Sequence, residues 1–204
     1  MNNPQLILAS ASPRRAQLLT RAGIPFTVLI SPAKEPARKP ALIPTDIWPA
    51  TLAYIKAAAV QKHLETRNSK LETRLIRAAD TIVVSPTGAI LNKPRHRSHA
   101  ATMLLSLSGK THTVITGLCL LRGRHLRLTR AIATCKMKRL SKKQLDAYLD
   151  SNLWRGKAGA YGLQDPSTGA GTDPFITLLS GDPTTVVGLP LQLLQTELAS
   201  FPKD

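Results

Sequence analysis

The segment SASPRR at residues 10–15 combines groups that bind phosphate. A helix is predicted over residues 13–22, with Ser12 at its N-cap, so Arg14 and Arg15 lie in its first turn. The helix dipole disfavours cations there by about 0.3 kcal/mol or more each. Hydroxyl, guanidinium and backbone N–H groups gathered at a helix start favour an anion site. The alternative is a capped surface helix with solvated arginines.

A single carboxylate interrupts the apolar stretch AADTIVV. If a four-residue turn spans residues 85–88, counting outward along the hairpin places Asp80 opposite Lys93. A carboxylate in such a strand needs a partner, which a lysine or a metal ion would supply. Asp80 could therefore bind a hard cation or take a proton from water. The alternative is a structural ion pair at the sheet edge, and a register slip of one residue would break the pairing.

A lysine occupies the apolar face of the longest predicted helix, over residues 46–65. Lys56 lies three or four residues from Leu52, Ala53 and Val60. Its ammonium group either snorkels outward to water or points into a cleft that holds an anion.

The segment GKAGAYGLQ at residues 156–164 has glycines that allow close approach of a ligand to the backbone. Lys157 supplies a cation. The Gln164 amide can donate and accept, as recognition of a base edge requires. Flexible glycine loops without any such role are common, so this segment alone decides little.

Strands and helices alternate along the chain in a pattern that predicts a mixed α/β fold. Strands are expected over residues 5–9, 26–30, 75–85, 111–122, 126–136 and 175–179. Helices are expected over residues 13–22, 46–65 (capped by Thr45 or Asp46), 98–108, 141–150 (capped by Ser141), and from Pro190 onward. We expect one domain over residues 1–204, with two lobes around a cleft and no independent linker, and no regular structure over 152–174.

Composition narrows the class of partner. The 28 Lys and Arg against 12 Asp and Glu give a net charge of +16, which attracts polyanions, but aromatic residues are only 4% and do not favour a base-stacking platform. The apolar runs are too short to span a membrane, and the N-terminus has no secretory signal pattern. Cys119 and Cys135 are expected to be reduced and buried, in keeping with a cytoplasmic protein.

Six motifs together resemble the Maf family of nucleotide pyrophosphatases, in the family's order and over residues 6–198. They are LASASPRR, LAYIKA, AADTIVV with the following ILNKP, LLSLSGKTHTVITG, GKAGAYGLQ and VVGLPL. The resemblance implies an elongated mixed-sheet fold related to the inosine triphosphate pyrophosphatases. It also implies hydrolysis of a nucleoside triphosphate to the monophosphate and pyrophosphate with a divalent cation, Mg²⁺ or Mn²⁺.

The resemblance further implies roles for individual residues. Asp80 is the expected general base or metal ligand, with Glu35 as a second metal carboxylate. Thr81 and Gln164 are expected to select the nucleobase. The phosphates are expected to contact Ser10, Ser12, Arg14, Arg15, Lys56, Lys93 and Lys157.

Details of the motifs favour the family branch that acts on dTTP and UTP, because Thr81 follows Asp80 and the late loop reads KAGAYGLQ. Departures are Lys34 beside Glu35, where the family has an acidic pair, an Arg-His-Arg run at 95–97, a hairpin turn one residue longer than usual, and Asp165 after Gln164. Two other hypotheses stay open. The protein could be a weakly catalytic or non-catalytic regulator of cell division that binds nucleotide or, non-specifically, nucleic acid. It could also be a Maf enzyme of shifted specificity, such as for 7-methyl-GTP. A homodimer is a further open expectation.

Overall fold

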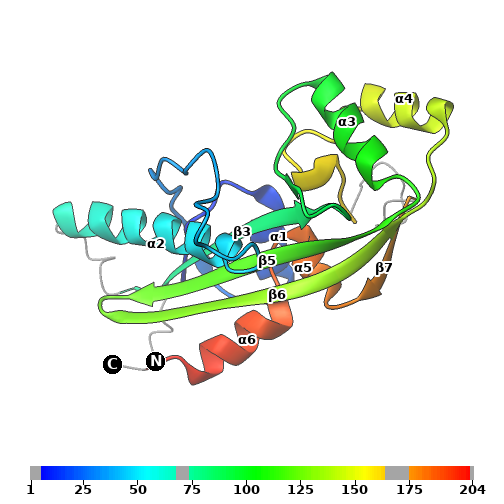
Figure 1. The fold of residues 1–204 in the computed structure, drawn as a ribbon. Coiled ribbons are helices and arrows are strands. Elements are labelled where there is room, and N and C mark those ends of the chain that lie inside the picture. The colour runs from blue at the N-terminus through cyan, green and yellow to red at the C-terminus, as the bar shows by residue number, and fades with distance from the viewer. Residues whose placement is uncertain (1–5, 68–73, 164–174, 203–204) are drawn as a thin grey trace. The chain divides into compact units, whose positions relative to one another are not determined.

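The computed structural model describes residues 6–67, 74–163 and 175–202, and these form a mixed α/β fold, as predicted (Figure 1). The strands are β1 (Leu6–Leu8), β2 (Phe26–Val28), β3 (Ile76–Val84), β4 (Ile90–Leu91), β5 (Thr111–Arg122), β6 (His125–Met137) and β7 (Ile176–Ser180). The helices are α1 (Pro13–Arg21), α2 (Trp48–Thr66), α3 (Arg97–Leu107), α4 (Lys142–Asp150), α5 (Pro183–Val187) and α6 (Leu191–Ser200), with one 3₁₀ turn, η1 (Ala158–Ala160).

The strands form one mixed sheet of order β2-β1-β3-β5-β6-β7, with β4 beside β3. β1 pairs in parallel with β2 and β3, whereas β3–β4 and β6–β7 are antiparallel. In the part of the chain that the structure describes, no helix combines the length and apolar character needed to cross a membrane.

The chain folds as two compact units, each assembled from separate segments. Unit 1 comprises residues 1–80, 116–131 and 188–204, and unit 2 comprises residues 81–115 and 132–187. The strands β3, β5 and β6 contribute residues to both.

In unit 1, α2 packs on one face of β1 and β3. Alternate residues are fully buried against the side chains of this helix: Ile7 on β1, Ala9 just after it, and Ile76 and Ala78 on β3. Because side chains alternate across a strand, the residues between them project to the opposite face. Arg77 is one of these. The side chains of β6 also project to both faces of the sheet. Arg127 pairs with Glu197 of α6 on one face, and Arg130 pairs with Asp46, just before α2, on the other. Accordingly, α2 and α6 lie on opposite sides of this part of the sheet (Figure 1).

Unit 2 has its own core, formed by α3 and α4 with parts of the long strands. The predicted apolar face of the helix at 98–108 is confirmed, since all four of its members are buried: Ala100, Met103, Leu104 and Leu107. Ser141 caps α4 as expected, in a reciprocal capping box with Gln144. Arg97 of α3 donates to Asp150 of α4 at 2.8 Å and joins the two helices.

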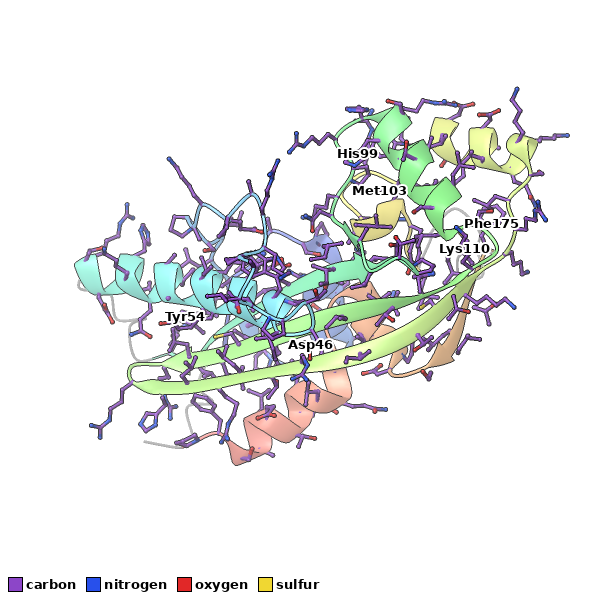
Figure 2. All side chains as sticks on the ribbon, in the orientation of Figure 1. Asp46, Tyr54, His99, Met103, Lys110 and Phe175 are labelled. Carbon is purple, nitrogen blue, oxygen red and sulfur yellow. The ribbon has the colours of Figure 1, made fainter. Side chains whose placement is uncertain are left out.

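The predicted cap of α2 is wrong. The helix begins at Trp48 with Ile47 at the N-cap position, and no side chain caps it. Asp46, labelled in Figure 2, instead forms an ion pair with Arg130, with Oδ2 2.8 Å from Nη2. The Asp46 carboxylate therefore binds a residue distant in sequence instead of capping the helix as the local pattern predicts. The short elements α5 and η1 were also not predicted.

Gly117 of β5 marks a close approach between this strand and the start of α2. A Cβ atom placed on it would lie 2.1 Å from the backbone N of Ala50 and 2.2 Å from the carbonyl carbon of Pro49. Backbone atoms cannot move aside as a flexible side chain can, so any larger residue would force α2 away from the sheet.

We therefore expect Gly117→Ala to lower the free energy of unfolding by about 3 kcal/mol or more, measured by urea denaturation. Gly123→Ala is the control: a Cβ there meets nothing within 4 Å, and only its positive φ of 53° carries a cost of about 1–2 kcal/mol. Equal losses in the two variants would show that α2 does not depend on this contact.

Candidate functional site

The SASPRR segment connects β1 to α1, as the sequence predicts. Ser12 occupies the N-cap position and Pro13 the first turn, but the Ser12 side chain makes no cap hydrogen bond. Its backbone N–H instead donates to Ser10 Oγ at 3.2 Å. The expected cap position is therefore correct and the expected cap bond is absent. Among described residues, α1 also has no acidic side chain in its first turn, so nothing acidic offsets the arginines there.

Arg15 is anchored rather than solvated. Its Nε donates to the Gly188 carbonyl oxygen at 2.7 Å, and its Nη1 donates to Ser10 Oγ at 3.1 Å. Burial lowers the pKa of Arg15, while the nearby Asp80 acts in the opposite direction. This geometry contradicts the alternative of a solvated surface arginine at this position. Arg14 is half-buried beside it, and its charge also lowers the pKa of Arg15.

Two carboxylates converge on the ammonium group of Lys56. Its Nζ lies 2.5 Å from Asp80 Oδ1 and 3.1 Å from Glu35 Oε1. The side chains of Lys56 and Asp80 are 13% and 15% exposed, whereas Glu35 is 47% exposed. Lys56 therefore does not snorkel to water. Ser31 Oγ donates to the Lys56 carbonyl oxygen at 2.9 Å, which ties the segment that carries Glu35 to α2.

The predicted pairing of Asp80 with Lys93 is wrong. The β3–β4 ladder pairs Val83 with Leu91 and Val84 with Ile90, one residue away from the expected register. The cause lies in the turn, where the Ser85 N–H donates to the Ala89 carbonyl oxygen while the Ser85 carbonyl oxygen accepts the Gly88 N–H, both at 2.9 Å. The Ser85 hydroxyl accepts the Ala89 N–H at 3.1 Å and stabilises this longer turn.

The carboxylate pair meets the requirements of a small hard cation. Mg²⁺ is bound through one or two carboxylates, with substrate phosphates and water as its remaining ligands. Asp80 and Glu35 already share one cationic partner, so their oxygens point to a common position. No group of three or more His, Cys, Asp or Glu side chains suited to a metal occurs in the described ranges, so a complete protein cage is not present there.

The remaining predicted residues belong to unit 2 or lie outside the description. Thr81 follows Asp80 on β3 and is half-buried, and Lys93 is exposed. Lys157 is buried, at 7% exposure, and its aliphatic chain packs beside Gly162. Gln164 lies outside the described residues. Unit 1 thus brings together Ser10, Ser12, Arg14, Arg15, Glu35, Lys56 and Asp80.

Comparison with known proteins identifies the family. A family model described as Maf-like protein matches residues 5–201. The chain belongs to the Maf family. This Maf protein is 40% identical to a dTTP/UTP pyrophosphatase of Rhodopirellula baltica over 208 residues, covering 99% of this chain and 85% of the relative. It is 38% identical to a dTTP/UTP pyrophosphatase of Cereibacter sphaeroides, covering 96% and 94%. A protein of the same name from Salinibacter ruber is 40% identical, covering 96% and 91%.

The glycine loop of this Maf protein has a backbone that few residues adopt. Gly159 and Ala160 both have φ of +67°, and Ala160 is fully buried. A Cβ on Gly159 would lie 3.0 Å from Val83 Cγ2, and its N–H donates to the Asn92 carbonyl oxygen at 3.2 Å. The loop that carries Lys157 is therefore held in one strained conformation by its surroundings.

A buried histidine–tyrosine pair holds the end of this loop, and sequence reasoning missed it. His112 Nε2 and Tyr161 Oη are 2.5 Å apart, and their rings meet edge to face with centroids 5.2 Å apart. The residues are 49 positions apart, so no local spacing could reveal the contact. Burial lowers the pKa of His112 to about 4, and the backbone of Lys110 only partly offsets this. His112 is therefore neutral at pH 7.

This pair makes unit 2 sensitive to acid. The folded-state pKa of about 4 lies below the ordinary value of 6.5, so the unfolded chain binds the proton more readily. The stabilisation is complete above pH 6.5 and is lost as the pH falls from 6.5 toward 4. Between pH 7 and pH 5 we expect His112 to account for a loss of about 2 kcal/mol in unfolding free energy.

The measurement is urea denaturation at both pH values for the wild type and for His112→Gln, whose side chain can still bond to Tyr161. The variant should lose less stability on acidification. His63→Gln, which leaves the pair intact, is the control and should follow the wild type. Equal losses in wild type and His112→Gln would contradict a neutral buried His112.

Proposed function

We propose that this Maf protein is a nucleoside triphosphate pyrophosphatase that hydrolyses dTTP and UTP to the monophosphate and pyrophosphate. The observation that carries the proposal is the convergence of Asp80 and Glu35 on Lys56, in the unit that also holds the Ser10–Arg15 segment. The names of the relatives support the choice of substrates, because three of them at 38–40% identity are dTTP/UTP pyrophosphatases.

The Ser10–Arg15 segment is the proposed phosphate site. Arg15 is already oriented by Gly188 and Ser10, so little side-chain entropy is lost when its guanidinium binds an oxygen anion. Arg14 and Ser12 lie on the same segment and are proposed as further phosphate contacts. Lys93 and Lys157, which belong to unit 2, are also proposed to contact the phosphates.

Asp80 is the proposed catalytic carboxylate, which holds the attacking water and accepts its proton. Lys56 orients Asp80, because its ammonium Nζ lies 2.5 Å from the carboxylate Oδ1. Attack at the α-phosphorus releases pyrophosphate, whose charge the cations of the site stabilise.

Asp80 and Glu35 would hold a divalent cation, Mg²⁺ or Mn²⁺. When bound, it supplies Lewis-acid stabilisation of charge on the phosphate oxygens. The bound cation would then compete with Lys56 for the two carboxylates. Glu35 is more exposed than Asp80, so it moves more easily. Thr81 and Gln164 are proposed to select the pyrimidine base.

A reducing compartment such as the cytoplasm suits the cysteines. Cys119 and Cys135 are free and buried. Burial raises the pKa of their thiols to about 12 and about 11, which keeps them protonated and unreactive.

A substrate panel tests the proposal. Purified protein is incubated with dTTP, UTP, CTP or 7-methyl-GTP, with Mg²⁺, Mn²⁺ or EDTA, and phosphate is measured with and without added inorganic pyrophosphatase. We expect turnover of dTTP and UTP that needs a metal, and phosphate only when the pyrophosphatase is present, because the product is pyrophosphate.

Two results would contradict the proposal. Preference for 7-methyl-GTP would indicate a Maf enzyme of shifted specificity. No turnover, together with steeply salt-dependent DNA binding, would indicate a regulator that binds polyanions.

A further inference from the structure

Arg77 is a fully buried cation in the middle of β3. Its side chain has no exposed surface, and none of its three guanidinium nitrogens has a hydrogen-bond partner among the described residues. Burying a charge without a partner is among the most costly arrangements in a folded protein. A side chain that costs this much and makes no hydrogen bond among the described residues calls for a role elsewhere.

The strand places Arg77 beside the proposed phosphate site. Arg77 pairs in register with Leu8 of β1, two residues before Ser10, and it projects to the face opposite α2. Burial lowers the pKa of Arg77 well below its ordinary value, and the charge of Arg15 lowers it further. Two guanidinium groups therefore repel each other, and that of Arg77 is fully buried.

An anion bound to Arg15 would relieve this repulsion. Asp80 and Glu35 act on Arg15, but both are already engaged by Lys56 on the α2 side of the sheet. In the ligand-free protein the charge of Arg77 thus stays largely uncompensated. Because the charge is buried, salt in the solvent screens it weakly.

We propose that Arg77 strengthens the binding of pyrophosphate groups at the Ser10–Arg15 segment, acting through Arg15 from inside the protein, at the expense of stability in the ligand-free state. Arg77 is a positioning and electrostatic residue under this proposal, and it does not touch the ligand. The proposal rests on the function proposed above only in taking this segment as the phosphate site.

The size of the effect follows from Coulomb's law. At an effective dielectric constant of about 20, opposite unit charges on the order of 10 Å apart attract strongly enough to tighten binding by roughly tenfold or more. The exposed arginines of the same unit should contribute far less, because water and ions screen them.

The test uses the full chain with inorganic pyrophosphate as the probe. Its Kd is measured by calorimetry at 0.1 M and 0.5 M salt, and the Tm is measured without ligand, for the wild type, Arg77→Met, Arg77→Lys and Arg21→Met. The last is the matched control, since Arg21 is an exposed residue of α1 in the same unit and its loss removes the same formal charge.

We expect Arg77→Met to bind pyrophosphate roughly tenfold more weakly at both salt concentrations. We also expect it to melt higher, by about 5 °C, because an apolar side chain replaces an unpaired buried charge. Arg77→Lys should bind as the wild type does, and Arg21→Met should change Kd little, with any effect lost at 0.5 M salt. Affinity and stability moving in opposite directions is a signature that a merely structural role would not produce.

A lower Tm or failure to fold for Arg77→Met would overturn the proposal, because it would mean that the native charge is paired. An unchanged Kd would overturn it as well. Neither result depends on turnover, so an Arg77-dependent pyrophosphate affinity in a protein that fails the dTTP and UTP assay would refute the proposed function and leave this inference standing.

Discussion

The candidate site depends on one shared interaction, the Lys56 ammonium group held between the carboxylates of Asp80 and Glu35. Three mutually close charges, two of them largely buried, are tolerable only because each has an opposite partner. The packing of α2 on the sheet makes this possible. Ala53 and Ala57 on the helix and Ala78 on β3 are small enough to let the helix lie close, and Gly117 on β5 lets its first turn approach the sheet.

The alternation of β3 separates two kinds of charge. Asp80 shares the α2 face with Ile76 and Ala78 and meets Lys56 there. Arg77 lies on the other face and interacts electrostatically with Arg15. Unit 1 therefore combines a carboxylate pair suited to a cation with cationic groups suited to an anion, and Arg15 is influenced electrostatically by the carboxylates and by Arg14. A triphosphate with its metal ion carries both kinds of charge.

Local features were predictable from the sequence. The α3 face and the Ser141 cap depend on residues within one or two helical turns, and both predictions are confirmed. The α2 cap was wrong because Asp46 is bound by Arg130, 84 residues away. The hairpin register was wrong because a single hydroxyl, that of Ser85, stabilises a turn one residue longer than the pattern suggests.

The site was also predictable only in part, because some of its contacts join residues distant in sequence. The motifs pointed to Ser10, Arg15, Lys56 and Asp80, but residue types alone left each with a structural alternative. Packing across 24 residues decides that Lys56 meets Asp80 rather than water. The 49-residue separation of His112 from Tyr161 hides their contact from any periodicity.

The central claim is that Asp80 performs chemistry, and Asp80→Asn tests it most directly. The variant keeps the side-chain shape, and Glu35 remains as a partner for Lys56, so the fold should persist. With dTTP and Mg²⁺, we predict pyrophosphate release at least about 100-fold slower than in the wild type. The Tm should stay within a few degrees, and the matched variant Asp46→Asn should keep a wild-type rate. A near-normal rate for Asp80→Asn in folded protein would contradict the account.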